Sequence, residues 1–331
     1  MRDPSLPSAV RIVEVGPRDG LQNEAAFVAT DVKLALISQL VEAGLRHIEA
    51  TAFVSPKWVP QMADAVEIMQ RIRRQTTPAR DLPVSDKGRG AATVRYAALV
   101  PNEKGMRAAL DAGCDEVAVF AAASETFSQR NINCSIAESF TRFAPVIEMA
   151  KAHGVAVRGY VSCVLGCPFE GDIAPEQVAA VSAHLYEMGC YEVSLGDTIG
   201  VGTPYRTQIM LDACLQRLPT AALAGHFHDT WGMAAANIYA ALRLGIATFD
   251  SSVSGLGGCP YSPGATGNVA TEDVVYLCEG LGIDTGVSLA RLVAAGAMIS
   301  SVLQRTPASR VARAWHARQI RQIRQEAGTE R

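Results

Sequence analysis

Two histidines, two positions apart, are the strongest candidates for chemistry in this chain of 331 residues. His226 and His228 stand in the stretch 222–230, which reads as a short β-strand followed by polar residues. Because side chains of a strand alternate between its two faces, both imidazoles would point the same way. Two imidazoles on one face, followed by an acid and a hydroxyl, can hold a divalent metal ion. They could equally be ordinary histidines near a strand end, so the pattern needs support from elsewhere.

Other polar residues also follow predicted strands. They are Arg18 and Asp19 after the first strand, Glu49 near the end of the second, Asp197 after the sixth, and Cys259 and Asn268 after the eighth. In a parallel barrel, the carboxyl ends of the strands meet on one face, where barrel enzymes keep their active sites. Because these residues are all expected on one face of the barrel, a metal site is favoured over a chance arrangement of polar residues.

One local pattern recurs along the chain and would position these residues. A helix-like stretch ends in glycine, as at Gly44, Gly113 and Gly154, and a short β-branched strand follows. Eight strands are predicted, near residues 10, 46, 95, 115, 155, 190, 221 and 247. Alternation of strand and helix predicts a parallel sheet, and eight units suggest a (β/α)8 TIM barrel. A doubly wound open sheet is the alternative, but no G-x-G-x-x-G follows the first strand.

The domain prediction follows from this count. We expect a single TIM-barrel domain over residues 1–331, with a core at about 10–300 and extra C-terminal helices at about 301–331. Residues 75–93, rich in proline, glycine and charge, are predicted to form an exposed loop. Arg305, Arg310 and Arg313 could contact a phosphate, but a solvated helix face is the simpler interpretation.

Composition limits the function classes. The net charge of −3 argues against a nucleic-acid surface, and no apolar run is long enough to span a bilayer. The N-terminus lacks the apolar core of a secretory signal. The eight cysteines are scattered, which predicts reduced thiols and a cytoplasmic location. Cys163 and Cys167 have no second pair nearby, so structural zinc is not expected.

The candidate residues can be assigned roles, each with a simpler alternative. Asp19, the two histidines and the amide oxygen of Asn268 would give mixed N/O ligation, which suits Mg²⁺ or Mn²⁺ and leaves Zn²⁺, Fe²⁺ or Co²⁺ open. Asp19 and Asn268 could instead be turn residues beside glycine. Arg18 could hold an enolate or carbonyl oxygen, or form a surface ion pair.

Cys259 lies in a glycine-rich loop, where a thiol could act as acid or base after the loop closes; a buried, inert cysteine is the alternative. Glu49 and Asp197 could orient the ligands or Arg18. They could also form ion pairs at the barrel mouth.

Several of these motifs together resemble the 3-hydroxy-3-methylglutaryl-CoA lyase family. The resemblance runs from about residue 10 to 300 and is carried by the segments 13–24, 53–62, 131–135, 194–200 and 252–261. The first segment also fits, more loosely, condensing enzymes such as isopropylmalate synthase; the cysteine-bearing loop around Cys259 separates the lyase. Ser254 and Ser262 stand where the family usually has alanine, and the match is poor after Leu303.

The resemblance implies metal-dependent cleavage of the acyl-CoA substrate to acetyl-CoA and acetoacetate. Asp19, His226, His228 and Asn268 would bind the metal. Arg18 would contact substrate and stabilise the enolate. His226, or a group to which it relays the proton, would act as base. Cys259 would be the catalytic thiol, with Glu49 and Asp197 as supporting acids.

Four alternatives stay open at this point. A lyase for a longer-chain homologue, such as isohexenylglutaryl-CoA, belongs to the same family, and a condensing enzyme is more distant. A two-His-one-carboxylate Fe²⁺ oxidoreductase would consume oxygen and need iron. A non-catalytic binding scaffold would not need these residues together. The fold class also allows a homodimer.

Overall fold

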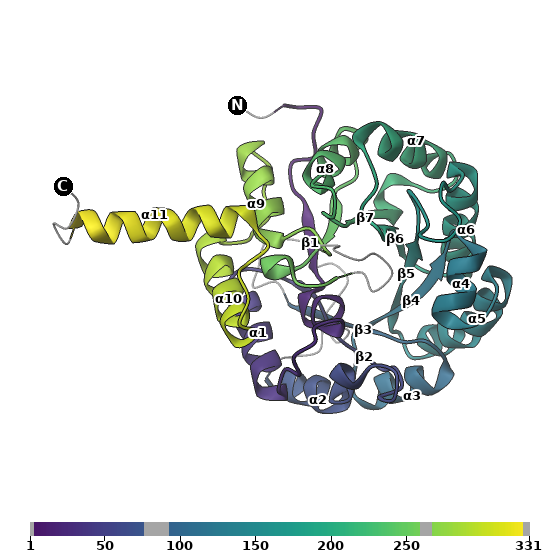
Figure 1. Cartoon of the computed structure of the whole chain (residues 1–331). Coiled ribbons are helices and arrows are strands. Elements are labelled where there is room, and N and C mark those ends of the chain that lie inside the picture. Colours follow the sequence, from purple (N-terminus) through teal and green to yellow (C-terminus); the bar gives the residue numbers. More distant parts are fainter. Residues whose placement is uncertain (1–2, 76–92, 259–266, 327–331) are drawn as a thin grey trace.

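The computed structural model describes residues 3–75, 93–258 and 267–326, and its strands form a closed barrel in which each strand pairs in parallel with the next (Figure 1). The TIM-barrel prediction is confirmed. The strands are β1 Arg11–Glu14, β2 His47–Ala52, β3 Arg95–Leu99, β4 Glu116–Ala122, β5 Ala156–Ser162, β6 Glu192–Asp197, β7 Leu223–Phe227 and β8 Thr248–Ser251. Each lies within a few residues of its predicted position.

Helices surround the barrel on its outside, except for the last one, which extends away from it (Figure 1). They are α1 Thr30–Glu42, α2 Ala65–Gln75, α3 Glu103–Asp111, α4 Glu125–Ile132, α5 Ile136–Ala152, α6 Pro175–Met188, α7 Pro204–Leu215, α8 Ala234–Arg243, α9 Thr271–Gly280, α10 Leu289–Val302 and α11 Arg310–Glu326. Short turns η1 Gly16–Gly20, η2 Pro60–Met62, η4 Thr220–Ala222 and η5 Val253–Gly255 complete the described elements. The predicted loop over 75–93 mostly lies outside the described residues.

Glycines end the helices where the pattern predicted. Gly44, after α1, has φ +110°, and a Cβ there would lie only 2.2 Å from the backbone oxygen of Gly286, in the segment between α9 and α10. Gly189, with φ +117°, is the left-handed cap of α6. Helix α1 has Ala29 as its N-cap, and the hydroxyl of its first residue, Thr30, donates to the Asp64 carboxylate at 2.9 Å.

The predicted strand over 221–228 is shorter than expected. Residues 220–222 form the turn η4, and β7 ends at Phe227. His228 follows as an isolated antiparallel bridge to Asn268. This bridge fixes the segment after β7, which carries His228, against the segment after β8, which carries Asn268.

The barrel wall has an apolar outside and a partly charged inside. Phe227 and Phe249, buried between strands and helices, belong to the hydrophobic core. The side chains on the inward face of the strands include charged groups. The strand register pairs His226 with Asp250 and Arg158 with Glu192 on neighbouring strands. The sequence of the barrel therefore builds a polar interior leading to its carboxyl-terminal mouth.

The C-terminal segment departs from the barrel. Helix α11 extends away from it (Figure 1), while Arg305 pairs with Glu24 and donates to the carbonyl oxygen of Gly255 at 3.1 Å. Arg305 is thus part of the mouth rather than of a solvated face. Among the described residues, no helix is long and apolar enough to cross a membrane. The division into a core over 10–300 and an extension over 301–331 stays a prediction.

Candidate metal centre and active site

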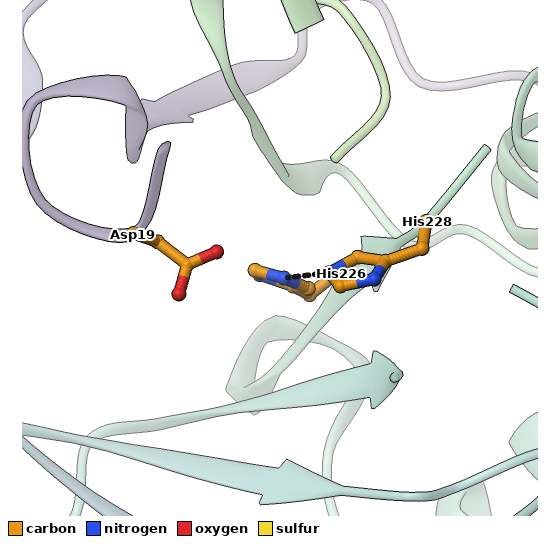
Figure 2. Close-up of side chains that lie close together, drawn as sticks. All are labelled: Asp19, His226 and His228. Atoms are coloured by element: carbon orange, nitrogen blue, oxygen red, sulfur yellow. Dashed lines mark hydrogen bonds between the residues drawn. The ribbon is translucent and has the colours of Figure 1, made fainter. Parts of the chain in front are cut away.

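Three side chains predicted from sequence come together at the mouth of the barrel. Asp19, His226 and His228 each offer one ligand atom, and these atoms lie within 4.8 Å of one another. Figure 2 shows the Asp19 carboxylate directed toward the two imidazoles. The Nε2 atoms of the histidines are 3.3 Å apart. Two nitrogens and a carboxylate oxygen converging at this spacing fit a divalent cation.

Chain connections place these ligands. Immediately after β1 the backbone forms the single π-helical turn η1, which ends in Gly20 and brings Arg18 and Asp19 over the mouth. Asn268 lies beside them through its bridge to His228. Its side-chain nitrogen donates to Asp19 Oδ2 at 2.8 Å and to the Leu256 carbonyl at 3.3 Å. That leaves the amide oxygen Oδ1 as the atom with which Asn268 could ligate a cation.

The electrostatics of Asp19 and His228 agree with cation binding, whereas the pKa of His226 is raised, which favours its protonated form. Burial, with a smaller contribution from His226, lowers the pKa of His228 to about 4, which keeps its ring neutral. Burial acts to raise the pKa of Asp19, but the Arg18 charge and the histidines outweigh it, so this carboxyl stays ionised. Burial opposes protonation of His226, while its hydrogen bond to Asp250 raises the pKa.

Arg18 is held beside the ligands by two carboxylates. Its Nη1 donates to Asp19 Oδ1 at 2.8 Å, and its Nη2 lies 2.6 Å from Glu49 Oε2. Glu49 also accepts from the Tyr160 hydroxyl at 3.3 Å. Arg18 is only 6% exposed, and its guanidinium carbon lies 5.7 Å from the centre of the Tyr160 ring. The alternative in which Arg18 forms a surface ion pair therefore does not apply, because the guanidinium is buried and fixed at the mouth.

One predicted residue, Asp197, stands apart from this cluster. The carboxylate of Asp197, at the end of β6, accepts from the backbone nitrogens of Val201 and Gly202 at 3.2 and 2.8 Å. Burial raises its pKa to about 6. This carboxylate closes the loop after β6, and the structure gives it no contact with Asp19 or the histidines among the described residues. Cys259 lies outside the described residues.

Sequence reasoning missed the residues that support His226 and Arg18. Asp250 Oδ2 lies 3.0 Å from His226 Nδ1, and Tyr160 lies edge-on to the His226 ring, with centroids 6.0 Å apart. A signal was available in both cases. Asp250 and Tyr160 are polar residues toward the carboxyl ends of predicted strands, and the alternation of side chains along a strand places each of them on the inward face.

Two buried acids hold the loops that carry the cluster. Glu14, fully buried at the end of β1, accepts from the backbone nitrogens of Gly16 and Val253, each at 2.8 Å. Glu272 accepts from the backbone nitrogen of Ser254, and burial raises its pKa to about 8. These bonds tie η1 to η5, so the loops after β1 and β8 form one supported unit.

Comparison with known proteins agrees with this geometry. The chain is 58% identical over 314 residues to the hydroxymethylglutaryl-CoA lyase of Pseudomonas mevalonii, covering 95% of this chain and 99% of the relative. It is 57% identical to a Pseudomonas aeruginosa protein named 3-hydroxy-3-isohexenylglutaryl-CoA/hydroxy-methylglutaryl-CoA lyase, covering 94% and 98%.

A crystal structure of hydroxymethylglutaryl-CoA lyase from P. aeruginosa superimposes with a TM-score of 0.87 at 57% identity, covering 95% of this chain and 99% of that one. The family model described as HMGL-like matches residues 9–299, which include every described residue of the cluster. On these grounds, the chain belongs to the HMGL-like family.

Proposed function

We propose that this chain is a metal-dependent carbon–carbon lyase that cleaves (S)-3-hydroxy-3-methylglutaryl-CoA to acetyl-CoA and acetoacetate. The observation that carries the proposal is the convergence of Asp19, His226 and His228 beside the buried guanidinium of Arg18. Relatives with this name share more than half of their residues with the chain over nearly its full length, which supports the same activity.

Four residues would hold the metal: Asp19, His226, His228 and the Asn268 amide oxygen. Oxygen and nitrogen ligands without a thiolate favour Mg²⁺ or Mn²⁺. The bound cation would lower the pKa of the substrate's tertiary hydroxyl and fix the substrate's orientation. The protein's own contribution is to hold the ligands before substrate arrives, through the His228–Asn268 bridge and the Asn268–Asp19 hydrogen bond.

Arg18 would stabilise the negative charge that forms during cleavage. Loss of the hydroxyl proton and breaking of the carbon–carbon bond leave an electron pair on the thioester fragment as an enolate. A guanidinium that is already oriented by Glu49 and Asp19 needs little reorganisation to bond the enolate oxygen. Protonation of the enolate carbon then gives acetyl-CoA. We assign that proton to Cys259 on the family resemblance alone.

Asp197 would support the site from a distance. Because its carboxylate accepts two backbone bonds from the loop after β6, it would keep that part of the mouth closed rather than touch substrate. Asp197→Asn should then affect stability of the mouth more than the chemical step.

A second candidate substrate is a longer-chain 3-hydroxy-3-alkylglutaryl-CoA. The observation that favours it is the 57% identical P. aeruginosa relative, whose name includes the isohexenyl compound. Steady-state kinetics with both thioesters test the choice. A kcat/KM at least tenfold higher for the methyl compound supports the first proposal, and a preference for the isohexenyl compound replaces it with the second.

We further propose a cytoplasmic, homodimeric enzyme. The cysteines within the described ranges are buried and are not joined in disulfides, as expected for a reducing compartment. The dimer rests on the frequency of dimers among closed symmetric assemblies. Light scattering after size-exclusion chromatography would measure it directly.

A further inference from the structure

Asp250, the acceptor beside His226, is itself held in place from the far side. Its Oδ1 accepts from Arg158 Nη2 at 2.7 Å, and its Oδ2 accepts from Arg158 Nη1 at 3.1 Å and from the Ser194 hydroxyl at 2.7 Å. Asp250 is 2% exposed and Arg158 is 1% exposed. With these donors in place, Asp250 Oδ2 meets His226 Nδ1 at 3.0 Å.

The partners of Asp250 determine which nitrogen of His226 carries the proton. An ionised carboxylate can only accept, so Nδ1 must donate. A neutral imidazole with its proton on Nδ1 presents a lone pair on Nε2, the nitrogen that faces His228 and Asp19. Partners of this kind fix the tautomer and the ring orientation of metal-bound histidines in general.

We infer that Arg158 is a positioning residue for the metal centre: acting through Asp250, it fixes His226 with Nε2 available as a ligand. This rests on the proposed metal-dependent function. Arg158 suits the role because its planar fork bonds both Asp250 oxygens while its Nε donates to Glu192 at 2.8 Å. Arg11 pairs with the other carboxylate oxygen of Glu192. The guanidinium therefore cannot rotate without breaking several buried bonds.

Asp250→Asn tests the tautomer. Arg158 requires an acceptor, so the amide oxygen should face the guanidinium and the amide nitrogen should face His226 Nδ1. That arrangement makes Nδ1 an acceptor and moves the proton to Nε2, where it blocks ligation. Nitrogen-15 NMR of histidine-labelled, metal-free protein, recorded at a pH where the His226 ring is neutral, should show its proton on Nδ1 in the wild type and on Nε2 in the variant. Mn²⁺ affinity, measured by electron paramagnetic resonance of free Mn²⁺, should fall 10- to 100-fold.

Arg158→Lys tests whether Arg158 acts through Asp250. Lysine keeps the charge but offers one ammonium in place of a fork, so Mn²⁺ affinity should fall at least threefold. Combined with Asp250→Asn, the same change should cost no more than Asp250→Asn alone, because the pathway is already broken. Arg158→Gln serves the same comparison should the lysine variant not fold.

Asp115→Asn is the matched control. Asp115 is buried and pairs with Arg73 at 2.7 Å on the outer side of the barrel, so its variant should lose stability and keep its Mn²⁺ affinity. A His226 proton still on Nδ1 in Asp250→Asn, or losses that multiply in the double variant, would overturn the inference. Neither measurement uses turnover, so the two proposals can fail separately. If the wild type has no lyase activity but the variants show the predicted changes in tautomer and Mn²⁺ affinity, only the proposed lyase is refuted. If the wild type is active and the variants do not show these changes, only the role of Arg158 is refuted.

Discussion

Arg18→Lys separates charge from geometry at the barrel mouth. The arginine fork bonds Asp19 through Nη1 and Glu49 through Nη2, at 2.8 and 2.6 Å. A lysine ammonium keeps the positive charge, but a single nitrogen on a flexible stem cannot reproduce two bonds made by opposite arms of a rigid fork. One of the two carboxylates therefore loses its partner.

The expected cost follows from those two bonds. One lost hydrogen bond between charged groups destabilises the folded state by about 1.5–3 kcal/mol. The effect on the activation free energy should exceed this loss of folding stability. Removing one donor aimed at a developing oxyanion raises the activation free energy by about 3–4 kcal/mol, which lowers kcat 100- to 1,000-fold. KM should change less than threefold, since the donor acts on charge that appears after binding.

The assay is steady-state cleavage of 3-hydroxy-3-methylglutaryl-CoA at saturating Mg²⁺, with thermal unfolding measured in parallel. Arg73→Lys is the control, because Arg73 also pairs with a buried carboxylate but lies away from the mouth. It should lose stability without loss of kcat. A kcat for Arg18→Lys within tenfold of wild type would refute the idea that a fixed guanidinium stabilises the enolate.

Other variants test the remaining parts of the site. His226→Ala should abolish turnover and weaken Mn²⁺ binding by calorimetry; unchanged activity would remove His226 from the site. Cys259→Ala should lower kcat strongly while Mn²⁺ affinity stays within twofold, and a fully active variant would leave the thiol without a catalytic role. Burial raises the pKa of Glu272 from 4.5 to about 8, so protonation of this side chain favours the folded state. Its contribution to the free energy of unfolding is complete below pH 4.5 and is lost as the pH rises to 8. The difference is about 5 kcal/mol, so Glu272→Gln should flatten the fall in unfolding free energy over this range; identical pH profiles in denaturant titrations would contradict it.

Local patterns were sufficient to predict the barrel. Glycine caps such as Gly44, followed by short β-branched runs, located five of the eight strands within a few residues, because both signals act over one turn or one strand. The strands near residues 10, 95 and 221 were predicted without a glycine cap and also lie within a few residues of those positions. The alternation of side chains along a strand is also a local signal, and it placed His226 and His228 on one face. The end of β7 was misjudged because His228 leaves the strand to bridge with Asn268, a contact between residues 40 positions apart.

Long-range partners explain what the sequence did not reveal. Arg18 meets Glu49, and Asp250 meets Arg158 across 92 positions; neither pairing can be read from spacing along the chain. Asp197 was grouped with the site because it ends a strand, but its carboxylate turns toward the backbone of its own loop. Position at a strand end predicts the face of the barrel, whereas the direction of each side chain depends on packing.

Metal-dependent cleavage is the central claim, and one assay tests it most directly. Purified protein is treated with chelator, dialysed, and given 3-hydroxy-3-methylglutaryl-CoA with and without Mn²⁺ under reducing conditions, while acetoacetate and acetyl-CoA are measured separately. The account predicts equal amounts of both products with Mn²⁺ and at least a 100-fold lower rate without it. Equal rates with and without metal, or no products from protein shown to bind Mn²⁺, would contradict it.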